Sequence, residues 1–175
     1  MGCGVKRLVF VAFIIGLLAG CSAKYSTKNV QENTELLKND TSVVISVPVD
    51  GFYETQQYTG SGNSTANAIR SAFMKHSDKV TVSPECHDLD CLKEKNIIKQ
   101  GYYVVPQILH WEDRATEWSG IPDKIEIKIT IYNAESNSRI ASTIISGKSK
   151  WATFGGDHPQ DLLPEPISSY ISSLY

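Results

Sequence analysis

Residues 85–91, ECHDLDC, place two thiols, one imidazole and three carboxylates within seven positions. Thiolates and imidazoles are metal ligands, and a cysteine pair can also serve redox chemistry or form a structural disulfide. A metal site here would use Cys86, His87 and Cys91 together with a neighbouring aspartate. The residue types alone therefore leave three kinds of site open, and the choice depends on the compartment in which the chain resides.

The N-terminus has the features of a secretory signal peptide. Lys6 and Arg7 precede an apolar run over residues 8–18, and small residues follow that run. The run is shorter than the roughly 20 apolar residues that a transmembrane helix needs. Residues 18–21, Leu-Ala-Gly-Cys, resemble the bacterial lipobox, in which the cysteine is lipidated and becomes the first mature residue. We expect a signal peptide over residues 1–20 and lipidation of Cys21; an ordinary secretory signal or an uncleaved anchor is the alternative.

An exported, lipidated chain resides in an oxidising compartment, where structural disulfides persist. Cys86 and Cys91 are the two cysteines that remain after lipidation, so we predict that they form a disulfide. Free thiols and a metal site are the alternatives. Structural zinc usually needs a second ligand pair. Redox cysteines are usually separated by two residues, whereas four residues separate Cys86 from Cys91. We expect Asp88 and Asp90 to favour the start of a helix through their negative charge, and His87 to face solvent.

Residues 110–118, HWEDRATEW, concentrate aromatic and charged side chains at the end of a predicted strand. Aromatic residues and arginine are enriched at the centres of protein interfaces. The segment therefore predicts a protein-binding surface, against the alternative of a strand end with two partly buried tryptophans. The candidate surface residues are His110, Trp111, Arg114 and Trp118.

Three motifs have catalytic or ligand-binding alternatives. Glu112 and Asp113 are neighbours on a predicted strand, so their side chains should point to opposite faces and not converge on one bond. His158 lies between two acidic residues, but no Gly-x-Ser-x-Gly motif accompanies it, and we expect a turn and a helix cap there. The glycine-rich residues 60–65 lack the lysine of a phosphate-binding loop. The sequence thus predicts no catalytic residue, no metal site and no cofactor.

Strands and helices that alternate along the chain must position these motifs. Ile125, Ile127, Ile129 and Ile131 alternate with polar residues, so one face of their strand should be buried and the other solvated. A returning strand should complete an antiparallel hairpin, and Pro106 should mark an edge or a bulge of the preceding strand. We expect strands at 42–49, 79–82, 102–111, 124–132 and 139–149, and helices at 64–77, at about 91–100 and from about Pro164 onward.

These elements predict an α/β (α+β) fold with a single domain over residues 41–175. Its mixed five-stranded sheet should have the element order β-α-β-α-β-β-β-α, with helices packed on it. The first two strand–helix units imply right-handed crossovers between parallel strands. Residues 21–40 are polar and lack a clear apolar period, so we expect a lipidated, flexible tether there.

The charge balance bears on partners and location. A chain cut before Cys21 has 155 residues with 15 basic and 19 acidic side chains, and no basic stripe. Nucleic acid is therefore not expected as a partner. By analogy with lipoprotein sorting, Ser22 after the lipidated cysteine favours the outer membrane over the inner membrane. We expect the chain to face the periplasm from its lipid anchor.

Several segments resemble a family of small bacterial lipoproteins known only as a domain of unknown function. HWEDR, the NAES turn and GGDHP carry the resemblance, which covers nearly the whole mature chain. At fold level the chain is similar to the N-terminal domain of the translocation protein TolB, the curli-secretion lipoprotein CsgG and the penicillin-binding-protein activator LpoB. Those relatives are envelope binding or assembly proteins rather than enzymes. The resemblance therefore implies a non-catalytic, lipid-anchored module that binds an envelope protein or forms part of an assembly; the alternative is a periplasmic hydrolase of cell-wall or glycan material.

Overall fold

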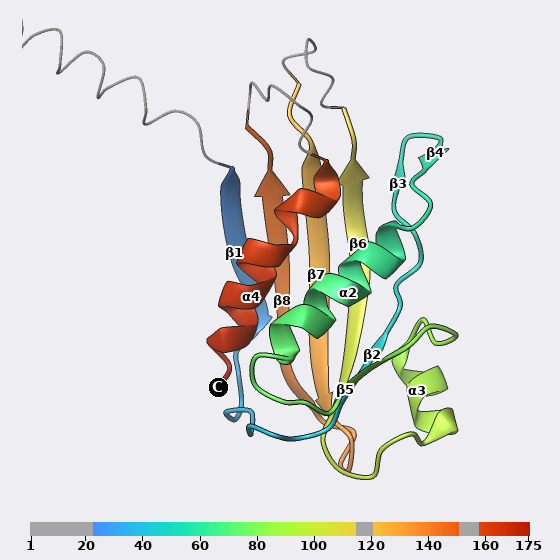
Figure 1. Ribbon diagram of the computed structural model, residues 1–175, viewed down its shortest axis with the longest axis vertical. Coiled ribbons are helices and arrows are strands. Elements are labelled where there is room, and N and C mark those ends of the chain that lie inside the picture. Colours follow the sequence, from blue (N-terminus) through green and yellow to red (C-terminus); the bar gives the residue numbers. More distant parts are fainter. Residues whose placement is uncertain (1–22, 115–120, 151–157) are drawn as a thin grey trace, which may run out of the picture.

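A six-stranded mixed sheet forms the centre of the molecule (Figure 1). The computed structural model describes residues 23–114, 121–150 and 158–175. The strand order is β1-β8-β7-β6-β2-β5, and a separate two-stranded hairpin, β3-β4, lies beside it. The bounds are β1 Lys24–Gln31, β2 Val43–Ser46, β3 Phe52–Tyr53, β4 Gln56–Gln57, β5 Val80–Ser83, β6 Tyr102–Glu112, β7 Lys124–Asn133 and β8 Arg139–Lys148.

The pairing confirms the predicted mixed α/β class, with one strand more than expected. β2 is parallel to both β5 and β6, as the two strand–helix crossovers predict. β6, β7, β8 and β1 are antiparallel to their neighbours, and β7 and β8 form the predicted hairpin. The parallel and antiparallel halves meet at β6, which is therefore the strand that joins the two parts of the sheet.

The additional strand, β1, lies inside the segment that was expected to be a flexible tether. It pairs antiparallel with β8 at the edge of the sheet, from Lys24 opposite Lys148 to Gln31 opposite Ser142. Most of its side chains are exposed, as is common for an edge strand, although Tyr25 packs against the main apolar cluster. The ordered sheet therefore begins at Lys24, only three residues after the predicted lipidation site.

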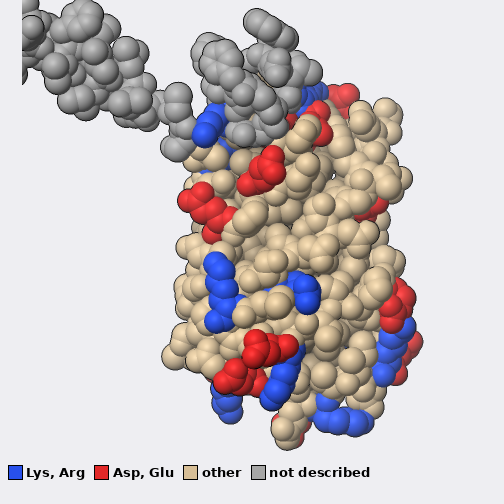
Figure 2. All heavy atoms as spheres, in the orientation of Figure 1, with Lys and Arg blue, Asp and Glu red and all other residues tan. Residues whose placement is uncertain are grey.

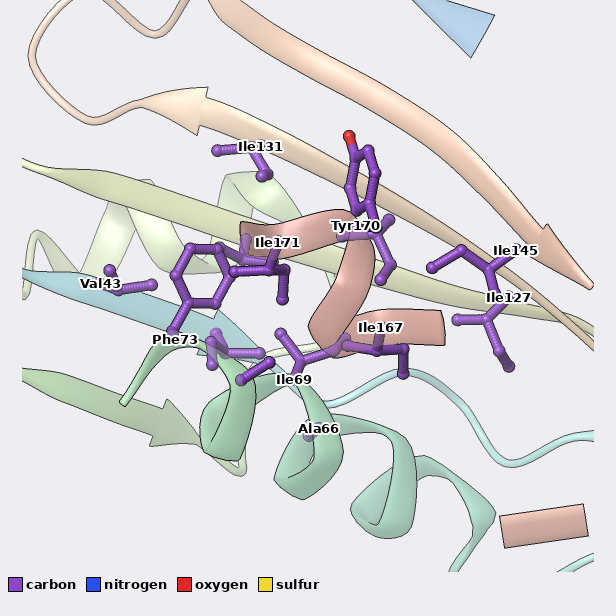
Figure 3. Packing of buried hydrophobic residues seen from close by; sticks show 14 of the residues in the cluster. Val43, Ala66, Ile69, Phe73, Ile127, Ile131, Ile145, Ile167, Tyr170 and Ile171 are labelled. Carbon is purple, nitrogen blue, oxygen red and sulfur yellow. The ribbon is translucent and has the colours of Figure 1, made fainter. Parts of the chain in front are cut away.

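Two helices cover one face of the sheet, α2 (Ser61–Phe73) and α4 (Pro164–Ser172), as Figure 1 shows. Figure 3 shows Ile69 and Phe73 of α2 and Ile167 of α4 pointing toward the isoleucines of the sheet. These side chains belong to one buried cluster, which includes every second residue of β7 from Ile125 to Ile131. The predicted buried face of β7 and the two predicted helices are confirmed, although α2 begins three residues earlier than expected and ends at Phe73.

The opposite face is covered only in part. The short helix α3 (Leu89–Lys95) packs Leu92 against Val44 and Tyr103 in a second, smaller apolar cluster. Beyond that cluster, the residues of β7 that alternate with the isoleucines are polar, and among the described elements no helix packs on them. We call this surface, from β1 to β6, the open face. No helix among the described residues is both long and apolar enough to cross a membrane.

A β-bulge in β6 sets which side chains reach each face near its end. The pairing with β7 shifts between Ile108 and His110, which leaves Leu109 as the additional residue. Ile108 packs on the helix-covered core, and strict alternation would return His110 to that core. The bulge instead places Trp111 opposite Ile125 in the core and His110 opposite Glu126 on the open face.

Pro106 lies before this bulge, in a part of β6 that has a partner on one side only. β2 pairs with β6 no further than Val104, whereas the pairing with β7 continues through Pro106. The missing N–H of the proline therefore interrupts no pairing with β2. The prediction that Pro106 lies at an edge or a bulge is confirmed, because β6 has a partner strand on one side only at this position.

Candidate functional site

The carboxylate of Glu112 is the centre of a charged cluster at the end of β6. Its side chain is only 3% exposed. One oxygen, Oε2, accepts from His110 Nε2 and Lys124 Nζ, each at 3.1 Å. The other, Oε1, lies 3.0 Å from Arg114 Nε. A buried carboxylate with three potentially cationic partners is far better compensated than a lone buried charge.

The cationic partners of Glu112 reach the surface beside the β3-β4 hairpin. Arg114 Nη2 donates to Tyr53 Oη at 2.7 Å, and the guanidinium carbon lies 4.6 Å from the centre of the tyrosine ring. The same tyrosine meets the His110 ring edge-on, with ring centres 5.4 Å apart. The Arg114 and His110 side chains remain about one third exposed, at 36% and 34%. We call Tyr53, His110 and Arg114 the Arg–Tyr–His surface.

The backbone around Arg114 is also fixed. Its N–H donates to Asp123 Oδ1 at 2.6 Å, and the backbone N–H of Asp123 donates to Ser149 Oγ at 2.9 Å. Asp123 precedes β7 and Ser149 follows β8, so the ends of β6, β7 and β8 are linked by hydrogen bonds. Tyr53 and His110 therefore lie on strands, and the backbone of Arg114, just after β6, is tied to the residues that flank β7 and β8.

The electrostatics of Glu112 favour an ionised, structural carboxylate. Burial acts to raise its pKa, but hydrogen bonds from His110 and Lys124, and the charges of Lys124 and Arg114, act against it; the net effect lowers the pKa below 4.5. A general acid at neutral pH requires the opposite shift. Glu112 is therefore suited to holding its cationic neighbours in place, not to donating a proton.

The structure separates Trp111 from His110 and Arg114, which the sequence grouped with it as a binding surface. His110 and Arg114 do lie together at the surface, as expected. Trp111 does not belong to this surface, because the bulge turns it into the core, where it is 3% exposed. It packs under Gly51, where a Cβ atom would lie 2.6 Å from Trp111 Cβ, so the β3-β4 hairpin approaches the tryptophan closely. Trp118 lies outside the described residues.

Asp113 and Glu112 point to different sides of the sheet, as predicted. Asp113 lies with Trp111 on a depression of about 420 Å³ between the α2 N-terminus and the β3-β4 hairpin. Its Oδ2 atom is 3.8 Å from His158 Nδ1. The backbone N–H of His158 donates to Asp161 at 2.9 Å in a capping box at η2 (Pro159–Leu162). The predicted helix cap at His158 is confirmed. The carboxylates of Glu112 and Asp113 do not converge on one bond.

The ECHDLDC segment forms a disulfide loop. Cys86 is bonded to Cys91, with 5.4 Å between their Cα atoms. Asp88 is the N-cap of α3, and its Oδ1 accepts from the Cys91 N–H at 2.8 Å. The His87 residue is exposed, as expected, although its Nδ1 atom lies 2.7 Å from the Val47 carbonyl oxygen. The loop thus fixes the start of α3 and packs buried Cys86 against the smaller apolar cluster.

The glycine-rich start of α2 already has an anionic partner within the chain. The Asp50 carboxylate accepts from the N–H groups of Gly60 and Gly62 at 3.1 and 2.8 Å. Gly60 is the N-cap residue, with a φ of 90°. The carboxylate occupies the position in which a phosphate would bind a helix N-terminus. This confirms an ordinary helix start, capped by a residue ten positions upstream.

Two members of the cluster were not predicted from the sequence. Tyr53 lies in a segment expected to be a loop, and the turn Glu54-Thr55 lacks the Asn-Gly or Asp-Gly signal of a tight hairpin. Lys124 is one of the polar residues on the strand face that was expected to be solvated, and nothing in the sequence indicates that it reaches Glu112. Across the described ranges, no group of three or more His, Cys, Asp or Glu side chains is placed to hold a metal ion.

Comparison with solved structures places this fold among bacterial proteins. PelC from Paraburkholderia phytofirmans, described as a dodecamer, shares 10% identity and has a TM-score of 0.65 over 86% of this chain and 97% of that chain. A point variant of the same PelC dodecamer gives 11% identity and a TM-score of 0.62 over 85% and 98% of the two chains. A protein of unknown function from Xanthomonas campestris gives 12% identity and a TM-score of 0.49 over 83% and 90%. At these identities the likeness to PelC shows a shared fold and nothing more.

No curated protein matches the chain. The likeness to TolB, CsgG and LpoB remains a prediction. The expectation of an uncharacterised family is confirmed, because a family model described as a domain of unknown function, DUF4823, matches residues 35–174. Among the described residues, the match includes every strand of the sheet except β1, the helices α2, α3 and α4, and the whole cluster around Glu112. The chain therefore belongs to the DUF4823 family.

Proposed function

We propose that the chain is a lipid-anchored cell-envelope protein that binds another envelope protein through the Arg–Tyr–His surface. The observation that carries this proposal is the buried Glu112 carboxylate, which holds Arg114 and His110 in fixed positions while leaving them partly exposed. Arginine and tyrosine are enriched at binding hot spots, and side chains that are already ordered lose less entropy on binding.

The lipid anchor at Cys21 would determine where this surface lies relative to the membrane. Such an anchor holds the domain at the periplasmic side of a membrane, and Ser22 favours the outer membrane. The end of β6 lies at the same end of the sheet as the start of β1, as Figure 1 shows. A partner at the Arg–Tyr–His surface would then also lie close to the membrane, which favours another membrane-associated protein.

Capture of the partner from intact envelopes tests the binding role. Cells that produce the wild type, Arg114→Ala or Arg70→Ala are crosslinked, and the captured proteins are identified by mass spectrometry. Arg70 is an exposed arginine on α2, so its replacement is a matched control. We expect one reproducible partner with the wild type and with Arg70→Ala, and its loss with Arg114→Ala. Equal capture by all three proteins would show that the partner does not bind through the Arg–Tyr–His surface.

The anchor is tested separately by Cys21→Ser. We expect this variant to lack the mass of the acyl chains, to retain its signal peptide and to be released by treatments that leave the wild type with the membrane. An unchanged mass would show that Cys21 is not lipidated. This result is independent of any partner.

Assembly with copies of itself is a second candidate function. It is favoured by the fold shared with PelC, which is described as a dodecamer, and by the exposed edge strand β1. Light scattering of the purified chain, with and without lipid vesicles, distinguishes this function from binding of a different protein. A monomer under both conditions would argue against self-assembly.

A further inference from the structure

Three lysines lie side by side across the open face at the end where β1 begins. The strand register places Lys24 of β1 opposite Lys148 of β8, and Lys148 opposite Lys124 of β7. Like charges at directly opposed positions of a sheet are destabilising. Lys24 and Lys148 are exposed, so this row of like charges is available to an anion from solution.

A shallow depression of about 440 Å³ lies along this row. Besides the three lysines it is lined by Ser26 and Ser146, whose hydroxyl groups can donate hydrogen bonds, and by His110. Glu126 also lines it. Cations and hydroxyl donors in one depression are the groups that bind phosphate oxygens.

The lining of the depression is more basic than the chain as a whole. Three lysines and one carboxylate, Glu126, line it, whereas the chain from Cys21 onward has 15 basic and 19 acidic residues. On the helix-covered face, which Figure 2 shows, both basic and acidic side chains lie at this end of the molecule. The excess of lysine over carboxylate in its lining would attract an anionic ligand to this depression.

The lysine row lies close to the predicted anchor along the chain. Lys24 is the third residue after Cys21, and an extended chain spans about 3.6 Å per residue, so their Cα atoms are at most about 11 Å apart. Figure 1 shows the chain entering the sheet at this end. A lipidated Cys21 would thus bring the lysine row within reach of the headgroup layer, which supplies phosphate groups.

We propose that Lys24 and Lys148, with Lys124 beside them, bind the phosphate groups of anionic phospholipids and hold this end of the sheet on the membrane surface. The inference rests on the proposed lipidation of Cys21. It goes beyond anchoring, because a lipid chain alone leaves the domain free to tilt, whereas a headgroup site on one end of the sheet fixes its orientation. Each lysine near an anionic surface contributes roughly a fivefold increase in the bound population.

Lysine labelling of the lipidated protein in vesicles tests the orientation. The lipidated chain is reconstituted into vesicles of phosphatidylglycerol or of phosphatidylcholine, treated with an amine-reactive reagent and mapped by mass spectrometry. We expect labelling of Lys24 and Lys148 to be about fivefold slower in phosphatidylglycerol, and the difference to disappear in about 1 M salt. Lys38 and Lys99 are exposed residues near the opposite end of the sheet, so their labelling should be the same in both vesicles.

A pair of charge-reversal variants separates the site from general charge effects. Lys24→Glu with Lys148→Glu should remove the slower labelling of Lys124 in phosphatidylglycerol, whereas Lys38→Glu with Lys99→Glu should leave it unchanged. Equal labelling rates in the two kinds of vesicle, or equal effects of the two double variants, would overturn the headgroup site. A chain that lacks acyl mass and does not remain with either vesicle would instead show that the proposed anchor is wrong, so the two failures are distinguishable.

Discussion

The two faces of the sheet use the same strands for different purposes. On the helix-covered face, β7 contributes four buried isoleucines that pack against α2 and α4. On the open face, the alternating residues of the same strand include Lys124, whose ammonium group lies 3.1 Å from buried Glu112. The first face supplies apolar burial, and the second positions charges.

In β7, the residues that stabilise the fold therefore lie on one face, and the residues of the candidate site lie on the other. Apolar packing depends on volume and shape, so the helix-covered face should respond strongly to loss of methyl groups. The open face should respond to changes of charge at Glu112 and hardly at all to changes elsewhere. The predictions below test this contrast, beginning with the largest expected effect.

Ile127→Ala should cause the largest loss of stability. Ile127 is fully buried between the sheet and the helices, so the substitution removes apolar contacts and leaves a cavity at a cost of about 3 kcal/mol. Urea unfolding measures the change. Ile144→Ala is the matched control, because Ile144 lies on the open face and is only half-buried. Equal losses from the two substitutions would contradict the contrast between the faces.

Replacement of Cys86 and Cys91 by serine should lower the free energy of unfolding by about 2 kcal/mol. The disulfide closes a short loop, and its main effect is to restrict the unfolded chain. Thermal unfolding of the double variant, compared with the wild type with and without reductant, measures this effect. Two free thiols in the oxidised wild type by mass spectrometry would show that the bond is not formed.

Glu112→Gln should lower the free energy of unfolding by about 1.5 kcal/mol. The amide has nearly the same shape but carries no charge, so Arg114 and Lys124 lose their shared counter-charge. Denaturant unfolding checks the value, and Glu126→Gln on the same face is the matched control. A variant as stable as the wild type would show that the cluster adds nothing to stability.

The advantage of wild type over Glu112→Gln should depend on pH. Because the folded pKa of Glu112 is lowered, its contribution to stability is fully present above its unfolded pKa near 4.5 and is lost as pH falls through the folded pKa. Unfolding of both proteins at about pH 6 and at about pH 3 tests the sign. The difference between them should shrink at the lower pH; a larger difference there would contradict the lowered pKa.

Lys128→Gln should have the smallest effect, within about 0.5 kcal/mol of zero. Lys128 pairs across the strands with Gln107 and Ile144 on the open face, and it makes no ion pair with another described residue. Urea unfolding under the conditions used for Ile127→Ala makes the two neighbours directly comparable. A loss above about 1 kcal/mol would show that Lys128 is packed more tightly than a solvated open face allows.

Apolar periodicity predicted the helix-covered face well, because burial leaves a signal along the chain. The isoleucines of β7 were assigned correctly to the buried face, and the helix expected at 64–77 overlaps α2. β1 left no such signal, since an exposed edge strand is stabilised by backbone pairing and not by its side chains. The two-residue strands of the β3-β4 hairpin are also too short to show a period.

The candidate site was predicted only in part, because long-range contacts define it. The local segment HWEDR predicted that His110 and Arg114 belong to a site. Tyr53 was not predicted, because it lies 61 residues before Arg114 in the chain. The bulge at Leu109 reversed the expected role of Trp111, and no local pattern announces a bulge of this kind. Asp50 likewise caps a helix that begins eleven residues later. Each contact depends on how the strands are arranged in the sheet.

The edge strand β1 also has a mechanical consequence. A lipid anchor at Cys21 would pull on β1 from its first residue and along its own axis, because the strand starts at the end of the sheet nearest to the anchor. Seven residue pairs join β1 to β8, and a force in this direction loads their hydrogen bonds together rather than one after another. Tension between the membrane and a bound partner would thus be transmitted into the centre of the sheet before β1 could peel away.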